Sequence, residues 1–126
     1  MVASGTTAAI AITASGGLSR IGISVATIDG YISSAEADSA ATLATSGTSL
    51  SLGVACNSGG VALWTTCRDA VNATTWSGAT EDDDQTPGTS YQQSSAHYLA
   101  TASGSQSAMA SWTGGANATL LAASWR

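Results

Sequence analysis

Half of the carboxylates in this 126-residue chain lie in one run, residues 81–84 (EDDD). Several carboxylate oxygens on one loop could bind calcium, and two carboxylates could act as a general acid and a general base. The run lacks the alternating aspartates and the glycine of a calcium loop, and no partner for acid–base chemistry can be identified. We interpret it as a solvated, mutually repelling loop tip, with a calcium site as the open alternative.

His97 is the single histidine, and it could act as a base toward one of the many serines. Nucleophilic catalysis needs a positioned nucleophile, a base and an orienting group. The chain contains no G-x-S-x-G elbow that would present such a serine. The sequence therefore predicts a protein that is not an enzyme, with no catalytic residues and no cofactor.

Cys56 and Cys67 are the two cysteines, and with one distant histidine they form no recognised zinc-ligand spacing. In the strand register proposed below they lie about 20 Å apart along the strands. That exceeds the limit of about 7 Å between the Cα atoms of a disulfide. We predict two small buried hydrophobic side chains and no metal site. Unpaired thiols suit a protein that folds in a reducing cytoplasm.

Four tryptophans are many for a chain without phenylalanine. In an exposed row they could stack on sugar rings, whereas buried tryptophans would serve as the large pieces of a core or as interface anchors. We favour interface or second-sheet packing, with sugar binding as the alternative. The candidate interface residues are Trp64, Trp76, Tyr91, Tyr98, Trp112 and Trp125.

The composition is unusually poor in charge, since 9% of the residues are charged against about 25% in an ordinary domain. There is no lysine, and the net charge is −5. A basic stripe that could neutralise phosphates is missing, which argues against nucleic acid as a partner. No run approaches the roughly 18 apolar residues of a membrane-spanning helix. A surface with so little charge is typical of a subunit that largely contacts other protein.

Leucine, isoleucine and valine make up only 19 of the 126 residues. One domain of this length (residues 1–126) can hold a single core. With so few large aliphatic side chains the core must be thin. A flat body that gains further burial from neighbouring subunits fits this composition.

Apolar and polar residues alternate with period two between glycine-rich turns, which predicts strands. The clearest unit is residues 48–68, where we expect a hairpin that pairs Cys56 with Val61 and Leu50 with Cys67 through a turn at residues 57–60. Its apolar side chains then share one face, namely Leu50, Leu52, Val54, Cys56, Val61, Leu63, Thr65 and Cys67.

Other segments complete the expected strand set. Residues 6–13 and 18–28 form a first hairpin, residues 33–47 a long surface connection, and residues 72–80 a short strand with Trp76. Residues 90–100 form a strand at an edge or interface, and residues 105–113 and 117–125 a last hairpin. About eight antiparallel strands with glycine-rich turns predict an all-β sandwich or jelly-roll-like fold.

Several stretches resemble small β-sandwich proteins of tailed bacteriophages and prophages. They are GGVAL (residues 59–63), NATTWSGATEDDD (72–84) and ATLLAASWR (118–126), with a looser similarity at LSRIGISVATIDGY (18–31). The resemblance spans about two thirds of the chain, and its motifs are structural. It implies a virion component such as a capsid decoration protein or a head–tail accessory protein, and it brings no catalytic residues.

The sequence thus predicts a virion structural subunit, assembled in the host bacterial cytoplasm, that decorates a capsid in many copies. Its expected partners are itself, as a homo-oligomer, and other capsid or tail proteins, with no nucleic acid and no membrane. The alternatives are a carbohydrate-binding jelly-roll module that uses exposed Trp and Tyr, and a filament or surface subunit outside phages.

Overall fold

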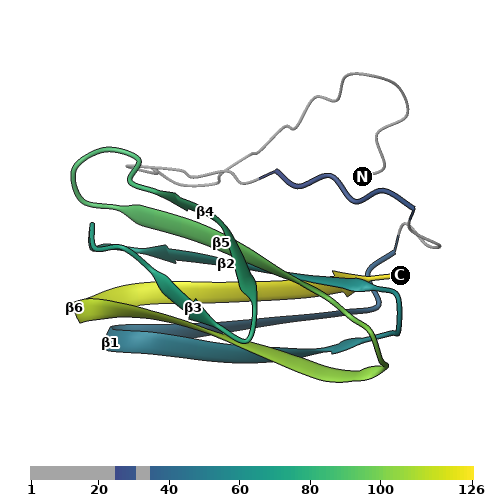
Figure 1. Cartoon of the computed structure of the whole chain (residues 1–126). Coiled ribbons are helices and arrows are strands. Elements are labelled where there is room, and N and C mark those ends of the chain that lie inside the picture. Colours follow the sequence, from purple (N-terminus) through teal and green to yellow (C-terminus); the bar gives the residue numbers. More distant parts are fainter. Residues whose placement is uncertain (1–24, 31–34) are drawn as a thin grey trace, which may run out of the picture.

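The computed structural model describes residues 25–30 and 35–126, and these contain six β-strands. All pairings between the strands are antiparallel, and the strands form one sheet in the order β1-β6-β2-β5-β4, with β3 paired to β6 (Figure 1). The strands are β1 (Asp38–Cys56), β2 (Val61–Arg68), β3 (Thr75–Ser77), β4 (Thr80–Gln85), β5 (Gln92–Leu99) and β6 (Gly104–Trp125). The prediction of an all-β antiparallel fold is confirmed.

The two longest strands, β1 and β6, pair with each other along both of their halves, and both bend in the middle. Register shifts interrupt the ladder between Ala44 and Ser49. Ser46 has a φ of 55° and Gly114 a φ of 78°, so the backbone of each strand enters the left-handed region at its bend. Beyond the bend each strand runs back over its first half, as Figure 1 shows.

The bends divide the sheet into two arms. The first arm contains residues 38–44 of β1 and 118–125 of β6, together with β2, β5 and β4. The second arm contains residues 49–56 of β1, residues 104–111 of β6, and β3. The indole N–H of Trp64 in the first arm donates to the carbonyl oxygen of Leu52 in the second (3.0 Å). The two arms therefore face each other across a shared interior.

The hydrophobic core lies between the arms and is built mostly from small side chains. Val54, Trp64 and Leu120 are its largest fully buried hydrophobic members. Eight alanines are also buried, at positions 62, 96, 100, 108, 110, 116, 118 and 122. Because alanine adds little volume, two strand layers can approach closely with few large side chains. This is the thin core that the composition predicts.

The predicted hairpin of residues 48–68 is wrong in its pairing. β1 and β2 do not pair in the sheet, because β6 lies between them in the first arm. The turn at residues 57–60 instead carries the chain from the second arm to the first. Two alternating strands joined by a four-residue turn can form either an arch of this kind or a hairpin. The sequence alternation therefore could not distinguish them.

The buried face of β1 is as predicted, with Leu50, Val54 and Cys56 inside. The buried face of β2 is the opposite of the predicted one. Val61, Leu63, Thr65 and Cys67 are only half-buried, whereas Ala62, Trp64, Thr66 and Arg68 are fully buried. The face of β2 that carries Trp64 points toward the second arm, where the indole N–H of Trp64 donates to the carbonyl oxygen of Leu52.

Two further expectations about strand boundaries are wrong. Residues 105–113 and 117–125 do not pair as a last hairpin, because they are the two halves of β6 and belong to different arms. Residues 33–47 are not a surface connection throughout, because β1 begins at Asp38. The small residues 38–44 form the first half of this strand, which is hydrogen-bonded to β6.

The acidic run and the segment after it also differ from expectation. Residues 81–84 belong to the edge strand β4 rather than to a loop tip. The strand at residues 90–100 is confirmed as β5, but it lies between β2 and β4 and is not at an edge. The short strand with Trp76 is confirmed as β3.

Gly78 explains how β3 can be followed so closely by β4. Its φ is 83°, and a side chain there would overlap the carbonyl group of Ser107 on β6. Only glycine suits both the left-handed backbone and this close approach.

The first predicted hairpin, residues 6–13 and 18–28, lies almost wholly outside the described residues. Within the described part of the chain, the strands form one open sheet rather than two separate sheets. A two-sheet sandwich or a jelly roll is not seen there.

Candidate functional site

A buried polar cluster at the end of β2 is the densest group of charged and polar contacts in the described residues. Arg68 is 1% exposed, and its guanidinium lies 5.0 Å from the ring centre of Trp112. Its Nη1 donates to the hydroxyl of Thr74 (2.7 Å), and its Nη2 donates to the carbonyl oxygen of Asn72. Burial lowers the pKa of Arg68, and the negative charge of Asp84 partly opposes this effect.

Asp84 completes the cluster from β4. Its carboxylate accepts hydrogen bonds from the backbone N–H of Thr74 (3.0 Å), from the Thr74 hydroxyl (2.9 Å) and from the side-chain amide of Gln92 (2.7 Å). The Thr74 hydroxyl thus accepts from Arg68 and donates to Asp84, so it links the two charges. The cluster connects β2, β4, β5 and the segment before β3. Arg68, Thr74 and Gln92 are buried and Asp84 is half-buried, so the cluster links these segments inside the fold.

The sequence analysis did not identify this cluster. One signal was available, because Arg68 shares a face with Trp64 and Thr66 by alternation and is one of only three arginines. A buried guanidinium on such a face requires partners. Its Nε has none, and it is the one unpartnered buried side-chain polar atom recorded in the described part of the structure.

The carboxylates of the acidic run point to different partners. Asp84 lies in the buried cluster, whereas Asp83 accepts from the side-chain amide of Gln85 (2.8 Å). Asp82 sits at a β-bulge between Glu81 and Asp83 and contacts His97. Among the described residues, no group of three or more His, Cys, Asp or Glu side chains is placed to hold a metal ion.

Glu81 is the first carboxylate of the run. Partial desolvation, together with the charges of Asp84 and Asp83, raises its pKa. An edge strand that carries such a charge density resists pairing with the edge of another molecule. The acidic run therefore protects this end of the sheet.

His97 is half-buried on β5, and its Nδ1 lies 2.5 Å from a carboxylate oxygen of Asp82. Its recorded hydrogen-bond partner is this carboxylate, and no serine hydroxyl is recorded with it among the described residues.

The six candidate interface residues do not lie together on one surface. Trp64 and Trp112 are buried, and their indole N–H groups donate to backbone carbonyl oxygens of Leu52 and Gly47 (3.0 Å each). These two side chains are core pieces and cannot contact a partner. This corrects their place in the candidate interface and removes Trp64 from any exposed sugar-binding row.

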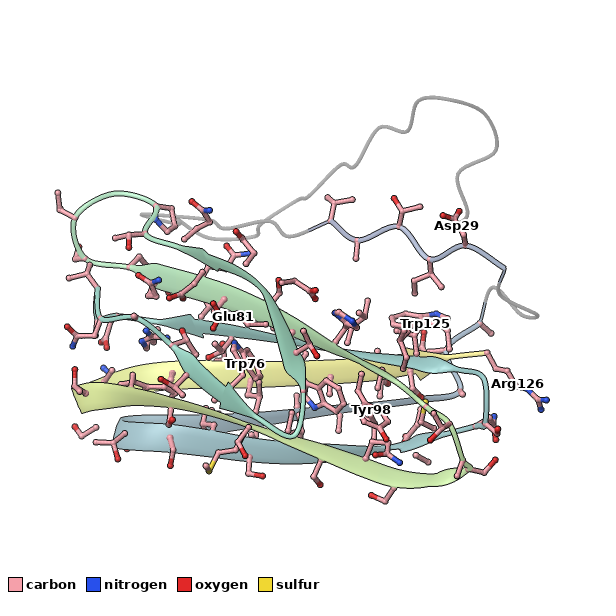
Figure 2. The ribbon with its side chains drawn as sticks, viewed as in Figure 1. Asp29, Trp76, Glu81, Tyr98, Trp125 and Arg126 are labelled. Carbon is pink, nitrogen blue, oxygen red and sulfur yellow. The ribbon has the colours of Figure 1, made fainter. Side chains whose placement is uncertain are left out.

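The other four aromatic side chains are half-buried. Trp76 and Tyr98 pack against the core, and the indole of Trp76 donates to the hydroxyl of Ser94 (2.8 Å). Figure 2 shows Trp125 and Arg126 near the end of the sheet that lies opposite the bends. Tyr91 lies beside Cys67 at the bent end. The candidate set is therefore divided between the interior and two ends of the molecule.

Both cysteines are free thiols, as predicted. Cys56 is buried, whereas Cys67 is half-buried and lines a shallow hollow of about 320 Å³ with Leu43, Tyr91 and Thr119. Desolvation raises the pKa of both thiols. The prediction of a buried side chain holds for Cys56 and only partly for Cys67.

The first arm turns one face away from the interior, and we call it the outer face. It carries the odd-numbered residues of four neighbouring strands, as the registers show. Three of its leucines are strongly exposed: Leu43 by 72%, Leu99 by 67% and Leu121 by 49%. Its remaining members are Ser39, Ala41, Thr119, Ala123, Trp125, Val61, Leu63, Thr65, Cys67, Gln93, Ser95 and His97.

No Asp, Glu or Arg occurs among these positions, and on the adjacent strand β4 Asp83 lies opposite Ser95 and therefore on the same side of the sheet. Exposed leucines on an uncharged sheet face are typical of a surface that contacts other protein. The sequence analysis missed this surface because it assigned Leu63 to the interior and residues 33–47 to a loop. The outer face is the best candidate for a functional surface.

Compared with protein families, with curated proteins and with solved structures, the chain gives no significant match. The described residues include no helix that is long and apolar enough to span a membrane.

Proposed function

We propose that this protein is a non-enzymatic structural subunit of a phage-type virion that decorates the capsid in many copies. The observation that carries the proposal is the uncharged outer face with Leu43, Leu99 and Leu121 exposed. A protein that functions alone in solution gains nothing from three exposed leucines on one face, whereas a subunit packed against neighbours buries them.

Other features support the same proposed function. The chain has few charges and no lysine, and three of its segments resemble virion β-sandwich proteins. The polar residues with unusual environments, Arg68 and Asp84, are linked through the Thr74 hydroxyl and hold the fold together. The two free thiols suit assembly in a bacterial cytoplasm.

The proposal includes a sandwich-like arrangement of the sheet. With its two arms face to face, the sheet would act as a sandwich-like, jelly-roll-like body, an architecture that recurs in capsid proteins. Its partners would be other copies of itself and the capsid or tail proteins beneath it.

Purified particles test the proposal. We expect the protein to co-purify with intact particles through a density gradient, in a fixed ratio to the major capsid protein by quantitative mass spectrometry. Averaged images of the particles should show it as a repeated knob on the capsid surface. Absence from purified particles, with the protein found only in the unassembled fraction, would refute the proposal.

The carbohydrate-binding alternative has lost its main support, because Trp64 and Trp112 are buried. A glycan array on the intact protein still distinguishes it from the virion role. Saturable binding that is lost in Trp125→Ala, with folding retained, would favour the sugar-binding module.

A further inference from the structure

The outer face presents three strongly exposed leucines, namely Leu43, Leu99 and Leu121. Leu121 on β6 lies opposite Thr65 on β2 and Ala41 on β1, so small or apolar side chains surround it. An apolar sheet face is stabilised when a second layer packs over it, at a distance of about 10 Å. A segment that supplies this layer must be apolar on one face and long enough to follow the strands.

Residues 1–24 precede the first described segment, and their sequence has the pattern of such a layer. Apolar and polar or small residues alternate in residues 6–13 and again in residues 18–24, with Gly16 and Gly17 between the two runs. This pattern predicts a hairpin with one apolar face. A run of about eight residues extends over about 26 Å, and β2 and β5 also have 8 residues each. The segment therefore matches the first arm in length.

The isoleucines of the chain are confined to the region around this segment. All six lie between positions 10 and 32, and the core recorded for the described residues contains none of them. Ile28 belongs to the described segment that directly follows residue 24. It is half-buried, whereas the other members of residues 25–30 are exposed. The isoleucines before it need an apolar surface to pack against, and the leucines of the outer face provide one.

The distribution of charge also suits this segment. Arg20 is the only charged side chain among residues 1–28, and all eight carboxylates come later in the sequence. On its β4 side the outer face is bordered by Asp83, which lies on the same side of the sheet, and by Asp82, which contacts His97. A segment with a single arginine can cover the leucines without bringing further negative charge to this border.

The connection between the segment and the first arm is long enough for such packing. Asp38, where β1 begins, lies ten positions after Ile28, and the N–H of Ala37 donates to the carbonyl oxygen of Ser124 on β6 (2.7 Å). Ten residues can span about 33 Å, more than the distance between two layers. Because the segment is tethered, its effective concentration at the face is on the order of millimolar. A contact of modest area is therefore sufficient within one chain.

We infer that residues 6–24 of this chain pack on the outer face as a second layer and cover Leu43, Leu99 and Leu121 in the free subunit. The inference goes beyond the proposed function, in which neighbouring proteins bury the same leucines after assembly. A neighbour that binds the outer face would displace the chain's own segment, so the segment limits contacts of the leucines before assembly.

Methyl NMR of the full chain tests the contact directly. With the isoleucine and leucine methyl groups labelled, we expect NOE cross-peaks from isoleucines of residues 6–24 to Leu121 and to Leu43 or Leu99. The absence of all such cross-peaks in the folded chain would overturn the inference. A mixture of chains labelled only on isoleucine with chains labelled only on leucine is the control. Cross-peaks in that mixture would come from a second copy and would also overturn it.

Trypsin provides a second measurement. The chain has no lysine, Arg68 is buried and Arg126 is the last residue, so cleavage of the folded chain reports on Arg20. Leu121→Asp places a carboxylate in the centre of the contact and should raise the rate of cleavage after Arg20 by about tenfold or more, because cleavage follows the population of the open form. The matched control is Met109→Asp, since Met109 is partly exposed (39%) but lies on the second arm. It should be cleaved like the unaltered chain.

Equal cleavage rates in Leu121→Asp and the unaltered chain would contradict the inference. An equal increase in Leu121→Asp and Met109→Asp would contradict it too, because the cause would then be a general loss of stability. Circular dichroism verifies that the variants fold, and Leu99→Asp replaces Leu121→Asp if the latter does not. Both measurements use the free chain, whereas purified particles test the proposed function, so either can fail while the other stands.

Discussion

The carboxylate of Asp38, the first residue of β1, accepts a hydrogen bond from the backbone N–H of Ala55 near the end of the same strand (2.7 Å). Seventeen residues separate the two positions in the sequence. A straight strand would place them more than about 50 Å apart. The hydroxyl of Ser124 donates to the carbonyl oxygen of Ala55 at the same place (2.6 Å). These bonds fix the end of one arm against the start of the other.

We expect Asp38→Ala to lower the free energy of unfolding by about 1 kcal/mol, because two backbone N–H groups lose their acceptor. Chemical denaturation measures the change, and amide exchange should become faster at Ala55. Asp29→Ala removes the same charge from an exposed position and should change stability by less than about 0.5 kcal/mol. Equal losses in the two variants would contradict a specific role for Asp38.

Arg68→Ala should lower the free energy of unfolding by about 3 kcal/mol, because it removes a buried guanidinium and leaves Thr74 and Asn72 without their donor. Arg68→Lys should lose less but remain destabilised, since one ammonium group cannot reproduce the planar fork of donors. Thermal and urea unfolding provide the measurement. Arg126→Ala, at the exposed C-terminus, serves as the control and should be neutral. An Arg68→Ala variant with an unchanged free energy of unfolding would show that the cluster does not hold the strands together.

Glu81→Gln should stabilise the protein slightly at pH 7, by no more than about 0.5 kcal/mol. The pKa of Glu81 is raised in the folded state, so its ionised form is disfavoured there relative to the unfolded chain. As the pH falls through the folded pKa toward the ordinary value of 4.5, Glu81 takes up a proton and this cost disappears. The stability difference between Glu81→Gln and the unaltered chain should therefore vanish below about pH 4.5. Urea titrations at pH 7 and pH 4 would show it. A difference that persists at pH 4 would contradict the assignment.

The two thiols should differ in reactivity in the folded protein. Cys56 is 3% exposed and should react with a thiol reagent only after denaturation. Cys67 is half-buried with a raised pKa, so it should react slowly at pH 7 and faster as the pH approaches 9. Mass spectrometry of partially labelled protein identifies the site. Preferential labelling of Cys56, or a disulfide between the two, would contradict the observed register.

Substitutions on the two faces of β2 test which face is buried. Thr66 is fully buried, and its hydroxyl donates to the carbonyl oxygen of Thr119 (2.9 Å). Thr66→Val should therefore cost about 1 kcal/mol of unfolding free energy. Cys67→Ser should cost less, because its hydroxyl would remain partly hydrated in the hollow. Chemical denaturation of the two variants would establish which face of β2 is inside, and the reverse order would support the hairpin.

The sequence by itself determined the class of local structure. Period-two alternation is a property of neighbouring residues, so it correctly located β3 around Trp76, β5 at residues 90–100 and the inward face of Leu50, Val54 and Cys56. The scarcity of leucine, isoleucine and valine also indicated a thin core, because it limits the apolar volume that any fold of this chain can bury.

Only the tertiary structure decided which strands pair and which residues meet. A four-residue turn fits both a hairpin and an arch, and the choice depends on β6, whose residues come some forty positions later and insert beside both β1 and β2. The buried cluster likewise joins Arg68, Thr74, Asp84 and Gln92 from separate segments. The outer face is decided in the same way. Leu43, Leu99 and Leu121 become one surface because long-range pairing aligns four strands, and no local pattern encodes that alignment.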